Sequence, residues 1–183
     1  PALNSALPKD VRIMEAVHVS DNLHARFSAR SRTYRYFIRC GQTAFAHQLP
    51  YCWHIRHEPD IEVLNRMADV LTGELDCTAF SAAGDQSKSK SRYLYGARFF
   101  FDGDCLVFEI SANAFLWRMV RSITGTLIRL EQRKGCKEDF ERILRSKDRR
   151  NAGETAPPQG LFLWSIDYPA ELLMPQEKPD SAG

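Results

Sequence analysis

The sequence predicts one α+β domain, built on a largely antiparallel, mixed sheet with helices packed on one face. The predicted elements follow the order strand, strand, helix, strand, strand, helix, helix, strand. Residues 93–112 form two strand-like runs joined by an Asp-Gly turn, and such a hairpin makes neighbouring strands antiparallel. The 183 residues, 44% of them hydrophobic, suffice for one domain with a substantial core.

The first two strands are predicted near the N-terminus. Residues 11–19, VRIMEAVHV, are apolar and rich in β-branched side chains. Residues 31–40, SRTYRYFIRC, alternate as a strand does. The alternation places Thr33, Arg35, Phe37 and Arg39 on one face and Tyr34, Tyr36 and Ile38 on the other.

A loop from Gly41 to Pro59 precedes the first predicted helix, which Asp60 is suited to cap and Gly73 to end. The apolar residues of this helix recur at helical spacing: Ile61, Leu64, Met67, Ala68 and Leu71. Residues 81–92, SAAGDQSKSKSR, contain almost no apolar side chain and are expected to form an exposed, mobile loop. The hairpin follows, with its turn at Asp102 and Gly103.

Residues 111–127, SANAFLWRMVRSITGTL, are predicted to form a helix with Asn113 as its N-cap. One face carries a core stripe of Phe115, Leu116, Met119, Val120, Ile123 and Leu127. The other carries Arg118, Arg121 and Arg129 with Trp117 and Gly125. Because glycine costs about 1 kcal/mol against alanine inside a helix, Gly125 indicates a close approach by another group. By itself, the pattern favours solvated arginines.

The C-terminal part is predicted to add a helix over residues 137–145, a turn-rich loop over 149–159 and a last strand over 160–169 that Pro169 ends. We expect the domain to occupy residues 1–170 and residues 171–183 to be a disordered tail. The chain begins without Met and lacks the features of a signal peptide. This fits a cleaved product or a piece of a longer protein.

Composition excludes several classes of protein. The five cysteines contain no CxxC pair and the histidines no metal-binding spacing, so no metal site is expected and a reducing cytoplasm fits. No Gly-rich phosphate loop or Gly-x-Ser-x-Gly elbow is present. No apolar run approaches the roughly 20 residues of a membrane span. The net charge is only +2, so nucleic-acid binding would need local clustering, such as the five arginines of residues 25–40.

Three features could meet RNA, and each has an ordinary alternative. The strand at 31–40 interleaves arginine with tyrosine, a combination that captures unpaired RNA, but a half-buried strand with snorkelling arginines fits better by itself. The loop with Lys88, Lys90 and Arg92 is typical of a solvated loop. The arginine face of 111–127 is typical of solvated charge. These patterns support the hypothesis that the protein binds RNA, but they do not predict which reaction it catalyses.

Taken together and in order, the three features resemble the TruA family of tRNA pseudouridine synthases. LHARFSARSRTYRYFI resembles the family's Phe-His-Ala-Arg-Phe-Ser-Ala run and Arg-x-Tyr-x-Tyr strand. FSAAGDQSKSKSR resembles its Gly-Asp-Gln loop, and ISANAFLWRMVRSITGTL its Ala-Asn-Ala-Phe-Leu, Met-Val-Arg and Gly-Thr-Leu segment. APPQGLFLWSIDYP resembles its Ala-Pro-x-x-Gly-Leu-x-Leu strand, and LNSALPKDVRI its Asn-x-x-Leu-Pro-x-Asp-Ile entry. The resemblance spans nearly the whole chain.

The resemblance implies the C-terminal catalytic half of the pseudouridine synthase fold. It also implies isomerisation of uridine to pseudouridine in the tRNA anticodon stem-loop, without a cofactor, by a cytoplasmic enzyme that is a homodimer at full length. It carries over Tyr34 as the tyrosine that packs on the target uracil, Arg121 as the partner of the catalytic aspartate, and Leu161 as an apolar wall of the base pocket. The RNA-binding residues that follow from it are Arg26, Arg32, Lys88, Lys90, Arg92 and Arg118.

Two departures from the family pattern matter. The family's catalytic aspartate lies in an upstream Arg-Thr-Asp-x-Gly-Val-His motif that this chain does not contain, so we expect a fragment that is inactive alone. Trp117 and Arg118 replace the usual His-His, and Lys-Ser-Lys-Ser-Arg replaces a Pro-containing run. Two alternatives stay open: a non-catalytic RNA-binding module that uses the same basic face, and a dimerisation or scaffold domain.

Overall fold

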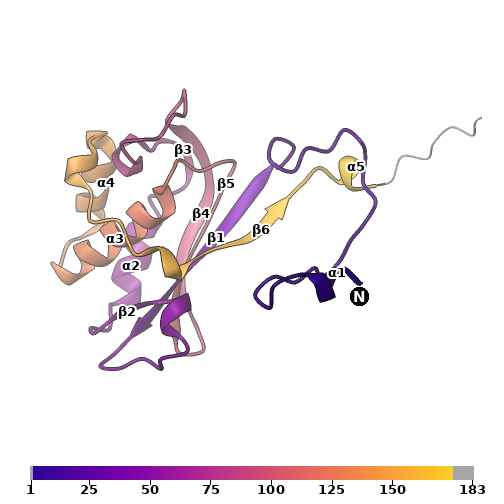
Figure 1. Cartoon of the computed structure of the whole chain (residues 1–183). Coiled ribbons are helices and arrows are strands. Elements are labelled where there is room, and N and C mark those ends of the chain that lie inside the picture. The colour runs from indigo at the N-terminus through magenta and orange to yellow at the C-terminus, as the bar shows by residue number, and fades with distance from the viewer. Residues whose placement is uncertain (1, 175–183) are drawn as a thin grey trace, which may run out of the picture. The chain divides into compact units, whose positions relative to one another are not determined.

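The computed structural model describes residues 2–174, which separate into two compact units (Figure 1). One unit is Arg30–Asp167, and the other joins residues 2–29 to residues 168–174. Of the segment expected to be a disordered tail, Glu171–Leu173 belong to a short helix, α5 (Ala170–Leu173). Residues 175–183 lie outside the described residues.

A six-stranded mixed sheet forms the centre of the larger unit, in the order β2-β1-β5-β4-β3, with β6 also paired to β1. Its strands are β1 (Ser31–Cys40), β2 (Trp53–Ile55), β3 (Gly73–Asp76), β4 (Ser91–Asp102), β5 (Cys105–Ala112) and β6 (Leu161–Asp167). β1 is antiparallel to β5 and β6 and parallel to β2. The predicted fold class is therefore confirmed.

Three helices gather on one side of this sheet (Figure 1). They are α2 (Ile61–Ala68), α3 (Met119–Gln132) and α4 (Lys137–Ser146), and single 3₁₀ turns cover Leu49–Tyr51, Thr78–Phe80, Arg149–Asn151 and Pro158–Gly160. The core between helices and sheet includes Tyr36, Ile38, Leu64, Phe80, Phe108, Met119, Ile123 and Phe140. The Asp60 carboxylate accepts hydrogen bonds from the Glu62 and Val63 amides, as predicted for the cap of α2.

The smaller unit contains α1 (Ala2–Ala6) and α5, and its residues 7–29 have no helix or strand. The Asn4 side chain exchanges two hydrogen bonds of 2.8 Å with the Ile13 backbone. The strand predicted at 11–19 is wrong, because these residues have no regular structure and residues 11–18 are exposed. β-Branched side chains form a strand only where a neighbouring strand supplies hydrogen bonds and a face to pack on.

Three boundaries within the larger unit differ from the predictions. α2 ends at Ala68, whereas Gly73, at φ +86°, begins the unpredicted strand β3. The loop predicted at 41–59 contains β2. The hairpin pairs Asp102 with Cys105, so its turn consists of Gly103 and Asp104, one residue later than predicted.

The helix predicted from Asn113 begins only at Met119, after Arg118 in the left-handed conformation. Asn113 instead extends the sheet, since its backbone amide donates to the Tyr93 carbonyl at 3.0 Å and its side-chain oxygen accepts from the Tyr93 amide at 3.1 Å. Residues 113–118 therefore form a connection between β5 and α3. The helix predicted at 137–145 and the last strand are confirmed as α4 and β6.

Candidate active site

The crossing of α3 with residues 153–156 brings two backbones into contact. A Cβ at Gly125 would lie 1.9 Å from the Glu154 carbonyl oxygen and 3.0 Å from the Ala156 nitrogen. A Cβ at Gly153 would lie 2.8 Å from the Cα of Thr126. The predicted close approach at Gly125 is confirmed, and the approaching group is the protein's own backbone.

Arg121 lies one turn before this crossing and holds the same segment. Its Nε donates to the Ala156 carbonyl at 2.7 Å, and the Ala156 amide donates to the Arg121 carbonyl at 3.1 Å. Burial lowers the pKa of the half-buried guanidinium, and the positive charge of Arg118 lowers it further. Among the ion pairs of residues 2–174, none joins Arg121 to a carboxylate.

Leu161 is connected to residues 156–157 by way of Tyr36, its partner on the neighbouring strand. The buried Tyr36 hydroxyl donates to the Pro157 carbonyl at 2.6 Å, and Leu161 lies opposite Tyr36 in the β1–β6 pair. Burial raises the pKa of Tyr36, and the nearby charge of Arg121 offsets part of this rise. The sequence interpretation missed this structural contact of Tyr36, although its position on the same strand face as Tyr34 was the available signal.

Tyr34 lies two residues before Tyr36 on the face of β1 toward the helices. It is opposite Ile110 of β5 and Leu163 of β6, and its ring meets Phe115 edge-on at 5.1 Å. The ring is half-buried. The structure thus brings Tyr34, Leu161 and Arg121 toward one region, because β6 and residues 156–160 connect β1 to α3.

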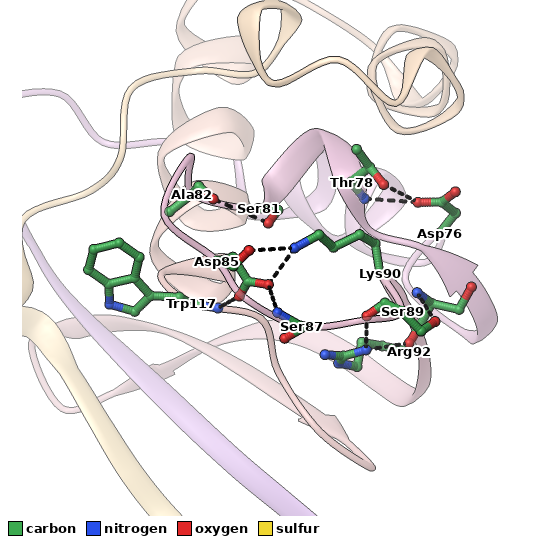
Figure 2. A network of polar contacts seen from close by, with 11 residues as sticks. Asp76, Thr78, Ser81, Ala82, Asp85, Ser87, Ser89, Lys90, Arg92 and Trp117 are labelled. Carbon is green, nitrogen blue, oxygen red and sulfur yellow. Dashed lines mark hydrogen bonds and ion pairs between the residues drawn. The ribbon is translucent and has the colours of Figure 1, made fainter.

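The predicted exposed loop is confirmed over residues 81–90, which have no regular structure and several exposed side chains, and a buried carboxylate anchors it. Asp85, with its side chain 3% exposed, accepts from the Trp117 amide at 2.6 Å, from Lys90 Nζ at 2.5 Å and from the Ser87 amide at 2.9 Å. Figure 2 shows the carboxylate between the Trp117 backbone and the Lys90 ammonium. The sequence pattern of the loop did not reveal this anchor, because Trp117, which binds Asp85, lies 32 residues further along the chain.

These contacts determine the charge state of Asp85. Burial by itself would raise the pKa of this carboxyl group, but the Lys90 ammonium and the amides of Trp117 and Ser87 hold it well below its usual range. Asp85 is therefore ionised at neutral pH, and it compensates the charge of Lys90.

Of the predicted RNA-binding residues, three bind other groups of the protein and three are exposed. Lys90 is paired with Asp85, Arg92 donates to the carbonyls of Ser89 and Ser91, and Arg32 donates to the Asn113 carbonyl. Lys88 and Arg118 are exposed. Arg26 is also exposed but belongs to the smaller unit.

We expect Lys90→Ala to lower the free energy of unfolding at pH 7 by about 2 kcal/mol, because it leaves the buried Asp85 carboxylate without its counter-charge. A lowered folded-state pKa stabilises the protein above the ordinary aspartate value near pH 3.9. This contribution disappears as the pH falls through the lower folded value, so wild-type stability should decline steeply below about pH 4.

Urea unfolding between pH 2.5 and 7 checks this prediction. Lys90→Ala should flatten the acid limb of the stability curve, whereas Lys88→Ala, an exposed lysine of the same loop, should change stability by less than about 0.5 kcal/mol. Equal stability of the Lys90 and Lys88 variants at every pH would contradict the anchoring role.

Neither a metal centre nor a membrane span emerges from the described part of the chain. It contains no group of three or more His, Cys, Asp or Glu side chains that could hold a metal ion. None of its helices combines the length and apolar character that a membrane crossing requires.

Comparison with known proteins identifies the family. A family model described as tRNA pseudouridine synthase matches residues 67–169. The tRNA pseudouridine synthase A of Treponema denticola is 67% identical over 173 residues, which cover 94% of this chain and 65% of that protein. The protein of the same name from Treponema pallidum strain Nichols is 59% identical over 84% of this chain and 55% of its own length. The tRNA pseudouridine synthase A of Thermoanaerobacter sp. strain X514 is 41% identical, and the match covers 91% of this chain and 68% of that protein.

The chain therefore spans between about half and two thirds of these relatives. The matched portion contains β1, α3 and β6, which carry Tyr34, Arg121 and Leu161 respectively. On the identity and the coverage together, this chain belongs to the TruA family of tRNA pseudouridine synthases.

Proposed function

We propose that this chain is the C-terminal part of an enzyme that isomerises uridine to pseudouridine in the anticodon stem-loop of tRNA. The observation that carries the proposal is Arg121, a half-buried guanidinium held by Ala156 beside Arg118, with no carboxylate partner among residues 2–174. A cation held in this way is suited to bind and orient an anion that comes from elsewhere. In the proposed enzyme that anion is the catalytic aspartate.

The reaction needs a base that stays bound while it turns. The N1–C1′ bond of the uridine breaks and a C5–C1′ bond forms, while a proton leaves C5 and N1 gains one. Tyr34 offers an aromatic face and Leu161 an apolar wall, which can hold uracil without fixing one orientation of its polar edge. Arg121 keeps the aspartate ionised and aimed at the nucleotide.

The aspartate is proposed to come from the part of the longer relatives that this chain does not match. We therefore expect the 183-residue chain alone to show no turnover in a tritium-release assay on tRNA labelled in its uridines. The same assay on a longer protein that includes the Arg-Thr-Asp segment provides the positive control. Robust turnover by the 183-residue chain would overturn the proposal.

The expected homodimer and the cytoplasmic location also belong to this proposal. The five cysteines are all free thiols, which suits a reducing compartment. Light scattering on the longer protein tests the dimer, and a mass of one subunit at working concentration would contradict it.

A non-catalytic RNA-binding module is the second candidate, favoured by the exposed cations Lys88 and Arg118. Phosphate contacts make the logarithm of affinity fall linearly with the logarithm of salt concentration, so both candidates predict salt-dependent tRNA binding. Turnover by the longer protein separates them, because only the synthase isomerises uridine.

A further inference from the structure

Trp117 is exposed and yet firmly held. Its side chain is 53% exposed, but its backbone amide donates to Asp85 and its carbonyl accepts from the Ala82 amide at 3.3 Å. The indole lies against Gly84, where a Cβ would come within 2.8 Å of a ring carbon. The anchored loop therefore holds the backbone of Trp117, while the indole packs on Gly84 and still presents surface to solvent.

Arg118 adds a positive charge to this surface. Its guanidinium lies 4.5 Å from the centre of the Trp117 ring, a cation–π contact. Its backbone is left-handed, at φ 61°, a conformation that residues other than glycine adopt at a cost. Within residues 2–174, Arg118 has no carboxylate ion pair, and its charge acts on Arg121.

Trp164 shows what a compensated pair of the same kind looks like. Its side chain is 50% exposed and lies under the guanidinium of Arg35 at 4.1 Å. Arg35, however, pairs with Glu109 at 2.7 Å, and Trp164 packs against Phe37. The Trp164 pair is bound within the protein, whereas within residues 2–174 no carboxylate pairs with Arg118 or with its neighbour Arg121.

We propose that Trp117 and Arg118 form a nucleotide subsite beside Arg121, in which Trp117 stacks on one unpaired base of the RNA and Arg118 meets its phosphate. The inference rests on the proposed function, and it places this nucleotide next to the target uridine in the RNA chain. Aromatic stacking with a neighbouring cation is the usual means of holding unpaired RNA. Asp85 and Lys90 serve the subsite indirectly, because they hold the loop that supports the indole.

The test is the affinity of the 183-residue chain for an anticodon stem-loop RNA at low and moderate salt. Trp117→Ala should weaken binding about 10-fold, in the range observed for loss of one stacked base. Trp117→Phe should recover most of the affinity, since it keeps an aromatic face. Arg118→Ala should reduce the slope of log affinity against log salt by about one.

Trp164→Ala is the matched control, because it removes a tryptophan of equal exposure and should leave RNA affinity within about 2-fold. Thermal unfolding should confirm that the Trp117 variants remain folded. Wild-type affinity in Trp117→Ala would overturn the subsite and leave the proposed function intact. A change in oligomeric state without a change in RNA affinity would make Trp117 a protein contact and also overturn it. If the wild-type chain binds no RNA even at low salt, the subsite and the RNA-binding part of the proposed function fall together.

Discussion

Gly125→Ala is expected to destabilise the protein by about 3–5 kcal/mol, against the general rule that alanine stabilises a helix by about 1 kcal/mol relative to glycine. The added methyl group would lie 1.9 Å from the Glu154 carbonyl oxygen. Both atoms belong to or extend directly from backbone, so no side-chain rotation relieves the overlap. The helix and residues 153–156 must move apart.

This separation would break contacts that hold the candidate site together. The Gly153 amide donates to Thr126 Oγ1 at 2.9 Å, and Ala156 exchanges hydrogen bonds with Arg121. Both Gly125 and Gly153 are buried, so water replaces these contacts only if the crossing opens. We therefore expect Gly125→Ala to disturb Arg121 as well as to lower stability.

Urea unfolding monitored by circular dichroism measures the effect. Gly84→Ala is the control, since its methyl group would meet the edge of the Trp117 ring, a side chain that can move. We expect that control to cost less than about 1 kcal/mol. A Gly125→Ala protein as stable as wild type would show that the two backbones do not pack as closely as described.

Tyr34→Ala is expected to lower turnover of the longer, catalytically complete protein by more than about 100-fold while leaving its affinity for tRNA mostly intact. Phosphate contacts supply most of the affinity of an RNA-binding protein, so one lost ring changes it modestly. Catalysis depends on the placement of the reacting base, and a misplacement of about 1 Å can cost 100-fold.

Tritium release measures turnover, and filter binding measures affinity. Tyr93→Ala is a suitable control because Tyr93 is an exposed tyrosine of the same sheet, on β4, with no proposed role in the site. Turnover near the wild-type value in Tyr34→Ala would show that the stacking role is wrong. An equal loss in Tyr93→Ala would indicate a general effect on the sheet.

Elements with a strong local pattern were predictable from the sequence. β1 alternates polar and apolar residues, Asp60 caps α2 by a hydrogen bond to residues two and three positions on, and α4 begins and ends within a residue of its predicted bounds. The start of α3 was not predictable in this way. Asn113 is suited to cap a helix, but its partner Tyr93 lies 20 residues away and holds it in the sheet.

The candidate site divides in the same manner. By its motifs the sequence alone determined the family, the strand of Tyr34, and Arg121, Leu161 and Gly125 as residues of interest. Only the tertiary structure decided that Asp85 is buried against the amide of Trp117, that Gly125 meets the backbone of Glu154, and that the region of residues 11–19 forms no strand. The physical reason is range. Periodicity and caps depend on residues within one or two turns, whereas the burial of a loop carboxylate, backbone crossings and strand pairing depend on partners that only folding brings together.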